Sequence, residues 1–236
     1  MSFKDSPSGD SIVTALAALA GVLLLSRGAQ AGERRLLVFL HVAVKQRALQ
    51  SELQASLPGV TVSTVGRLAD FDRALRDGQD AVLTLPMLLT ARGLQPKLRG
   101  HRQGSPDEKY SLIGVDVPPD PLRVSAVGAL DILGREGTNA FVHGIVASRP
   151  RVERVTKIED LLPLLQMQRT SAILLPSRLY AEIKASSRLN LAHRELSAPV
   201  GLPAVASVGP TGSEVLAAVS KLPLRITKPL GVEEWH

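Results

Sequence analysis

The sequence predicts an α/β protein of two lobes, each built in three layers with helices on both faces of a mostly parallel sheet. Three observations predict this fold class. Short apolar runs alternate with helical patterns from residue 34 onward, and this alternation occurs twice along the chain. Prolines at 118, 119 and 121 separate the two halves, and such a cluster stops both helix and sheet. A second proline-containing stretch, residues 197–203, precedes one last strand and helix, so we expect two crossovers to hinge the lobes.

In the first half, strands and helices alternate in an order that predicts right-handed crossovers and parallel pairing. Leu68, Phe71 and Leu75 have helical spacing, and Gly78 ends that helix. The expected elements are a buried strand at 36–43, a helix at 45–56, a strand at 60–65, a helix at 67–77, a strand at 81–85, a hairpin or exposed loop at 96–108 and an extended run at 109–117.

The second half repeats the pattern after the proline cluster. Thr156 and Glu159 are spaced as a capping box, and Thr211 and Glu214 open the last helix in the same way. The expected elements are a strand at 123–130, a helix at 138–148, a strand at 152–156, a leucine-rich helix from 157, a strand at 171–175, a helix at 178–186, strands at 189–196 and 204–208, and a helix ending at Leu222.

The first 31 residues predict a cleavable signal peptide. Residues 12–25 form an apolar run that is too short to span a bilayer, which takes roughly 20 residues. The sequence Ala29-Gln30-Ala31 follows as a small-x-small cleavage pattern. Asp5 and Asp10 offset Lys4, so a retained inner-membrane anchor facing the periplasm is the alternative. We therefore expect a periplasmic protein with a signal peptide at 1–31, a first lobe formed by 32–117 with 201–236, and a second lobe at 118–200.

Composition excludes several classes of protein. The 236 residues are 44% hydrophobic and 21% charged, which excludes a mainly disordered chain. There is no cysteine, so disulfides, a lipid anchor and Cys-ligated metals are excluded. Aromatics make up 3% and basic residues are dispersed, so we expect no nucleic-acid partner. The chain has no catalytic motif and no histidine pair at ligand spacing. We therefore expect a protein that is not an enzyme and that binds no metal ion and no cofactor. The net charge of +6 favours an anionic partner.

Two stretches carry a family pattern: RVERVTKIEDLLPLLQMQRTSAILLPSRLY at 151–180 and the helix, turn and strand at 71–83. In these stretches the chain resembles the type 2 periplasmic binding protein family, nearest to the phosphate/phosphonate-type solute-binding proteins of ABC transporters. The resemblance covers residues 34–222. It implies a monomer that captures a small anionic solute in an inter-lobe cleft and presents it to an inner-membrane ABC permease. Phosphonate-type members carry consecutive Ser/Thr residues where this chain has only Thr138 and Asn139. The alternative is therefore a non-transport periplasmic module of the same fold that acts as an interaction partner in an envelope system.

Ligands of open α/β sheets bind beyond the carboxyl ends of the strands, where helix amino termini point outward. Four segments occupy such positions, and we expect them to converge on one cavity. Their candidate ligand-binding residues are His41, Lys45, Pro86, Arg135, Gly137, Thr138, Asn139, Ser177 and Arg178. In the segment at 134–139, read as a glycine-containing loop, Thr138 could donate to an oxyanion and Arg135 could form a bidentate fork. The structural alternative is a helix cap at Thr138, a solvated Arg135 and a core or rim histidine at His41.

Overall fold

The computed structural model describes residues 33–42 and 45–236, so the expected signal peptide lies outside the described residues. Residues 34–236 form one compact unit. Across the described ranges, no helix has both the length and the apolar character needed to cross a membrane.

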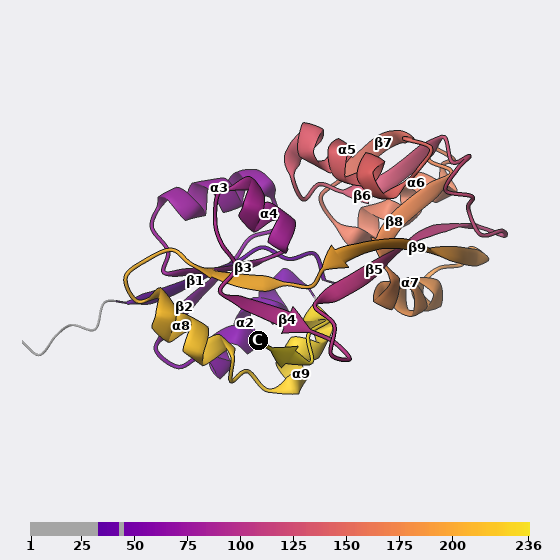
Figure 1. The fold of residues 1–236 in the computed structure, drawn as a ribbon. Helices are drawn as coiled ribbons and strands as arrows, with labels where there is room; N and C mark the ends of the chain where they lie inside the picture. The colour runs from indigo at the N-terminus through magenta and orange to yellow at the C-terminus, as the bar shows by residue number, and fades with distance from the viewer. Residues whose placement is uncertain (1–32, 43–44) are drawn as a thin grey trace, which may run out of the picture. The chain divides into compact units, whose positions relative to one another are not determined.

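The first lobe is a six-stranded sheet in the order β11-β4-β10-β3-β1-β2 (Figure 1). β1 pairs in parallel with β2 and β3, whereas β10 is antiparallel to β3 and β4, and β11 is antiparallel to β4. The strands are β1 (Arg34–Val38), β2 (Val60–Thr64), β3 (Ala81–Thr84), β4 (Leu98–His101), β10 (Ala204–Ser207) and β11 (Glu234–Trp235). The helices are α2 (Gln46–Ser56), α3 (Leu68–Arg76), α4 (Pro86–Ala91), α8 (Gly212–Val219) and α9 (Leu224–Thr227), with the 3-10 turn η3 (Lys228–Leu230).

Alternation along β1 builds the three layers of this lobe. Leu36 and Val38 pack in one apolar cluster with residues of α2 and α8. Leu37 and the following Phe39 pack in another with residues of α3 and α4. Because successive strand residues face opposite sides, a run that is apolar at every position needs helices on both faces.

The second lobe is a five-stranded sheet in the order β7-β6-β8-β5-β9. β6 is parallel to β7 and β8, and β5 is antiparallel to β8 and β9. The strands are β5 (Asp107–Val115), β6 (Ala126–Leu130), β7 (Arg151–Val155), β8 (Ala172–Pro176) and β9 (Leu191–Gly201). The helical segments are α5 (Gly134–Ile145), η1 (Ile158–Asp160), α6 (Leu161–Gln166), η2 (Ser177–Leu179) and α7 (Tyr180–Ser186). The predicted two-lobe α/β arrangement is confirmed, and both sheets are mixed rather than mostly parallel.

The chain crosses between the sheets earlier than the proline cluster predicts. β5 is a second-lobe strand, so the first crossover is the turn at 102–106, where Gln103 and Gly104 have φ of 50° and 76°. The expected crossover at 117–121 is wrong. Pro119 instead packs against Gly114 at the end of β5, where an added Cβ would lie 2.8 Å from the ring. Prolines here terminate a strand within one lobe.

The return crossover is shorter than expected. β9 continues to Gly201 instead of ending near Leu196, and Pro199 pairs with Lys109 of β5. A proline is tolerated at this position because β9 is the edge strand of its sheet. The crossover is thus confined to Leu202 and Pro203. Sequence patterns also missed α4, β4, α9 and β11, all of six residues or fewer.

Neither expected capping box forms. Lys157 precedes η1 and Thr211 precedes α8, and neither makes a side-chain cap hydrogen bond. At α8 the Asp80 carboxylate takes this role, since it accepts the Thr211 N–H at 3.2 Å and the Arg35 N–H at 3.0 Å. The carboxylate of Asp80, in the turn before β3, therefore fixes the start of α8 against the sheet.

Gly212 allows this close approach of α8 to the sheet. An added Cβ would lie 2.5 Å from the Asp80 carbonyl oxygen and would also overlap the Ser207 side chain. We expect Gly212→Ala to lower the free energy of unfolding by about 1–3 kcal/mol because it overpacks a buried contact. Gly144→Ala in α5, where a Cβ would meet nothing within 4 Å, is the control and should raise it by about 0.5–1 kcal/mol. Urea unfolding measures both, and equal stability of Gly212→Ala and the parent would contradict this packing.

Candidate functional site

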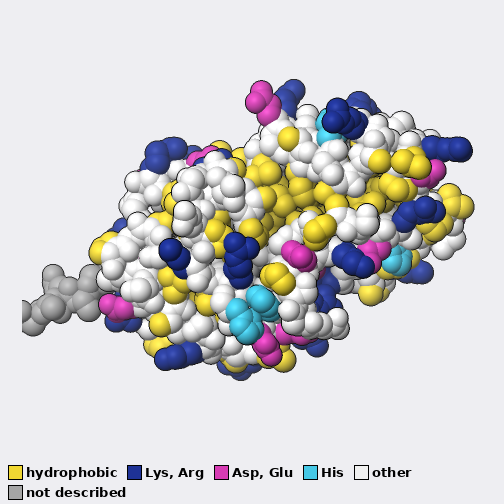
Figure 2. Space-filling view, in the orientation of Figure 1, with side chains coloured by type: hydrophobic (Ala, Val, Ile, Leu, Met, Phe, Trp, Pro, Cys, Tyr) yellow, Lys and Arg dark blue, Asp and Glu magenta, His cyan; other side chains and the backbone are white. Residues whose placement is uncertain are grey.

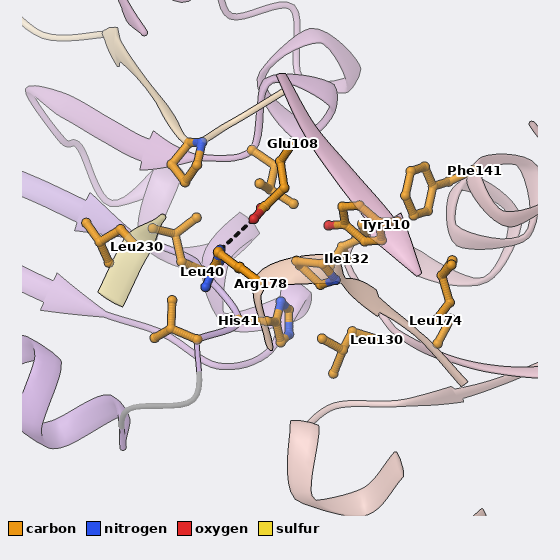
Figure 3. Close-up of a pocket in the computed structure, with 15 residues that line it drawn as sticks. Leu40, His41, Glu108, Tyr110, Leu130, Ile132, Phe141, Leu174, Arg178 and Leu230 are labelled. Atoms are coloured by element: carbon orange, nitrogen blue, oxygen red, sulfur yellow. Dashed lines mark ion pairs between the residues drawn. The ribbon is translucent and has the colours of Figure 1, made fainter. Parts of the chain in front are cut away.

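Strand ends from both lobes converge on a cavity of about 30 Å³ (Figure 3). The first lobe contributes the residues that follow β1 and β3, and the second contributes β6, β8 and the residues after them. The lining residues are Leu40, His41, Val42, Leu85, Glu108, Tyr110, Ala129, Leu130, Ile132, Phe141, Leu174, Pro176, Arg178, Pro203 and Leu230. This inner cavity is mostly apolar, and among the described residues its charged lining residues are Glu108 and Arg178.

Glu108 and Arg178 form a buried ion pair in the wall of the inner cavity. Arg178 Nε lies 2.7 Å from Glu108 Oε1, and their side chains are 11% and 7% exposed, respectively. Glu108 belongs to β5, directly after the first crossover, and Arg178 lies in η2, directly after β8. Burial raises the pKa of Glu108, while the nearby Arg178 and Arg102 act to lower it. A buried pair of this kind is costly to break because each partner would leave the other charge uncompensated.

Arg178 also connects the second lobe to the carboxyl-terminal segment of the first. Its guanidinium donates to the Pro229 carbonyl at 3.4 Å. Gly231 has φ of 83°, and a Cβ added there would lie 2.6 Å from Arg178 Nε. The backbone of Gly231 therefore leaves space for the guanidinium. Arg178 is thus a structural link between the lobes as well as a wall of the cavity.

His41 carries an imidazole nitrogen with no partner in the described part of the chain. Nε2 is buried and makes no hydrogen bond, and the ring meets the Phe39 ring edge-on at 5.0 Å. Burial lowers the pKa of His41 to about 4, and Asp131 opposes that shift only in part. The imidazole is therefore neutral at pH 7. In Figure 3 it points toward the same space as Leu130 and Ile132.

A larger groove of about 330 Å³ shares Leu40, His41 and Val42 with the inner cavity. Three cationic residues line this outer groove. Lys45, Arg67 and Lys157 each occupy the N-cap position of a helical segment, at α2, α3 and η1. Helix amino termini carry partial positive charge, which adds to that of the side chains.

The acidic residues of the outer groove are Asp70 and Glu159. Asp70 already pairs with Arg73 at 3.6 Å. Within residues 33–42 and 45–236, no ion pair involves Lys45, Arg67, Lys157 or Glu159. The outer groove thus offers three uncommitted cations against one uncommitted carboxylate, which suits an anion.

Three of the four predicted segments contribute to the two cavities. His41 lines both, Lys45 lines the outer groove, and Arg178 lines the inner cavity. Pro86 lines neither and packs against Gly201, where a Cβ would lie 2.9 Å from its ring. Ser177 also lines neither, because its Oγ lies 2.8 Å from the Ser111 Oγ.

The fourth segment is helix rather than the expected loop. α5 begins at Gly134, so Arg135, Gly137, Thr138 and Asn139 lie in its first two turns, and none of them lines either cavity. Thr138 is buried inside this helix. Its hydroxyl donates to the Asp131 carboxylate and accepts from the Leu133 N–H, each at 3.1 Å. Local bonds therefore occupy the hydroxyl that was expected to face a ligand.

Sequence reasoning missed Arg67 and Lys157, although a signal for them existed. Each follows a strand of a parallel pair and precedes a helical segment, the position from which Lys45 was selected. The missed apolar wall, Ile132 and Phe141, had no such signal, because apolar residues after a strand are indistinguishable from core in sequence alone.

Comparison with known proteins identifies the fold. The sequence matches no known family profile and no curated protein. Among solved structures, the VFT2 domain of BvgS from Bordetella pertussis (a double mutant) is similar, with TM-score 0.59, 12% identity, and coverage of 88% of this chain and 95% of that one. The substrate-binding protein of an amino acid ABC transporter gives TM-score 0.57, 13% identity and coverage of 84% and 95%. Arginine-bound ArgBP from T. maritima, a Gly52Ala mutant, gives TM-score 0.53, 15% identity, and coverage of 89% of this chain and 98% of that one.

The fold is that of a Venus-flytrap, or type 2 periplasmic-binding, domain. The predicted fold class is therefore confirmed. The inner cavity and the outer groove are both lined by residues of the two lobes. The phosphate/phosphonate subtype stays a prediction.

The ion pair in the cleft wall generates a stability prediction. We expect Arg178→Met to lower the free energy of unfolding by about 3–5 kcal/mol, because Glu108 would remain buried and unpaired. Lys109→Met is the control, since the Lys109–Glu195 pair is 60% and 45% exposed and should contribute under about 1 kcal/mol. The double variant Glu108→Leu with Arg178→Met should recover most of the loss. Chemical denaturation measures all three, and a mild effect of Arg178→Met would contradict the assignment.

His41 generates a pH prediction. Its folded pKa of about 4 is below the usual 6.5, so the unfolded chain binds the proton first and stability falls as pH drops from 6.5 to 4. Relative to His41→Asn, the parent should lose up to about 3 kcal/mol across this window. His193→Asn, at an exposed position of β9, is the matched histidine-to-asparagine control. Parallel pH profiles of the parent and His41→Asn would show that His41 is solvated.

Proposed function

We propose that this chain is an exported solute-binding protein that captures a small anion between its lobes and presents it to an inner-membrane ABC permease. One observation carries the proposal: Lys45, Arg67 and Lys157, which have no ion-pair partner among the described residues, bring three cations to the outer groove, each at the start of a helical segment. One structural neighbour is the substrate-binding protein of an amino acid ABC transporter and another is arginine-bound ArgBP, which supports a non-enzymatic role.

The cations come from both lobes, which is what a closing mechanism requires. Lys45 and Arg67 start helices of the first lobe, and Lys157 follows β7 of the second. An anion that contacts all three would stabilise the closed arrangement more than an open one, because only closure brings the second-lobe charge to it. The volume of about 330 Å³ falls within the range of small-molecule sites.

A phosphate or phosphonate ligand would be held differently here than in the proteins that the sequence resembles. The hydroxyl of Thr138 is committed to Asp131 and Leu133, so lysine and arginine side chains would provide the contacts. The proposed site residues are therefore His41, Lys45, Arg67 and Lys157, with Arg178 holding the wall. Periplasmic location is part of this proposal and follows from the predicted signal peptide.

A second candidate function is a non-transport module whose lobes signal or bind a partner without solute delivery. The lobes already contact each other through apolar side chains. Leu133 packs against apolar clusters of both lobes, and Leu85 and Met87 of the first lobe pack against clusters of the second. Apolar side chains also gather between the lobes on the face shown in Figure 2. The similarity to the BvgS VFT2 domain is consistent with this alternative.

Charge removal in the outer groove tests the primary proposal. The parent is titrated with phosphate, sulfate, methylphosphonate and carboxylates in a calorimeter, and we expect at least one to bind. Arg67→Gln and Lys157→Gln should each weaken that ligand about tenfold, because each removes a charge-assisted contact of roughly 1.4 kcal/mol or more. Lys221→Gln removes the same charge outside the groove and should bind as the parent does.

Binding by no anion would contradict the primary proposal and favour the non-transport module. Anion binding that Arg67→Gln and Lys157→Gln leave unchanged would place the site elsewhere. Distances between spin labels on the two lobes, measured with and without the bound anion, separate the remaining cases: a change supports capture by closure, and no change supports a fixed module.

A further inference from the structure

The inner cavity restricts the chemical class of the ligand, which the charged outer groove alone does not specify. It adjoins the outer groove at Leu40, His41 and Val42, and its remaining walls include Leu130, Ile132 and Phe141. The two charges in its wall, Glu108 and Arg178, neutralise each other at 2.7 Å. The inner cavity therefore has no free charge with which to attract an ionic group, and burying one there would be costly.

The size of the inner cavity limits what can enter. A volume of about 30 Å³ has room for roughly two water-sized groups. An ethyl or isopropyl group meets that limit, whereas an aromatic ring or a long alkyl chain exceeds it. Burial of such a group would be favourable in proportion to the apolar area removed from water.

His41 marks the boundary between the charged and the apolar parts. It lines both cavities, its Nε2 is buried, and no partner for that nitrogen exists in the described ranges. A buried nitrogen without a partner costs free energy that a ligand oxygen at this position would recover. The neutral imidazole can donate to one carboxylate oxygen while the cations of the outer groove hold the other.

We infer that the solute is a short branched aliphatic carboxylate, with its acid group among Lys45, Arg67 and Lys157, one oxygen on His41, and its alkyl group in the inner cavity. This inference rests on the proposed function and specifies its ligand class. It excludes inorganic oxyanions as the preferred solute, because they have no apolar part to fill the space beside Ile132 and Phe141.

A chain-length series on the full, unsubstituted protein tests the inference by calorimetry. Affinity should rise about fourfold for each carbon added from acetate through isobutyrate to isovalerate, since each buried methylene contributes about that factor. Octanoate should bind more weakly than isovalerate because the cavity is too short for it. Isovaleramide, which has the same shape without the charge, should bind at least tenfold more weakly than isovalerate.

Variants of α5 locate the alkyl group. Phe141→Leu enlarges the cavity and should move the optimum to a longer acid, whereas Ile145→Val in the same helix does not alter a lining residue and should keep the isovalerate optimum. Because the length series needs no substitution, a variant that fails to fold does not remove the test.

The possible results separate this inference from the proposed function. Phosphate or sulfate binding with no gain from acetate to isovalerate would overturn the inference and leave anion capture standing. Binding of isovaleramide as tightly as isovalerate would overturn the assigned acid group. Failure of every carboxylate and every inorganic anion would overturn both.

Discussion

The buried ion pair of Glu108 and Arg178 lies within the second lobe and holds the arginine through which that lobe contacts the carboxyl-terminal segment of the first. It lies where β5 leaves the first crossover, and Arg178 reaches from the end of β8 to the carbonyl of Pro229. These contacts join three segments that are far apart in sequence: the crossover, the second-lobe sheet and the carboxyl-terminal return. Removing one partner would leave the other charge unpaired in an apolar surrounding, so the contacts of all three segments depend on both side chains.

The same arrangement explains why the cleft has two different parts. Strands that are buried on both faces deliver apolar residues to their ends, as Leu40 and Val42 show after β1 and Leu130 shows at the last position of β6. Helices begin a few residues later, and their N-cap positions lie farther out, where Lys45 and Lys157 are exposed. The lining of the cleft therefore changes from apolar residues at the strand ends to cationic residues at the helix starts. His41 lies at that change and carries the unsatisfied nitrogen.

The sequence predicted the elements whose patterns are local and long. The β1-α2-β2-α3-β3 order and its parallel pairing follow from apolar periodicity and the handedness of crossovers. The lobe membership of β5 did not follow, because pairing with β8 and β9 is a long-range property that its own residues do not express. Proline was a misleading guide, since Pro119 ends a strand and Pro199 lies within an edge strand.

The candidate site divides in the same way. Strand-end reasoning selected His41, Lys45 and Arg178, and all three line one of the two cavities, because topology alone brings such positions together. It failed for Thr138, since a hydroxyl beside two glycines has the same appearance in sequence whether it opens a loop or lies inside a helix bonded to Asp131. Whether such a hydroxyl is free depends on partners from other elements. Arg154 of β7 forms an ion pair with Asp131 at 2.7 Å, and this pair fixes the carboxylate that accepts the Thr138 hydroxyl. The segment at 134–139, which resembles an anion site in sequence, therefore has a structural role, because its Thr138 hydroxyl is hydrogen-bonded within the protein. The cations without an ion-pair partner in the described ranges, Lys45, Arg67 and Lys157, lie at the starts of other helical segments.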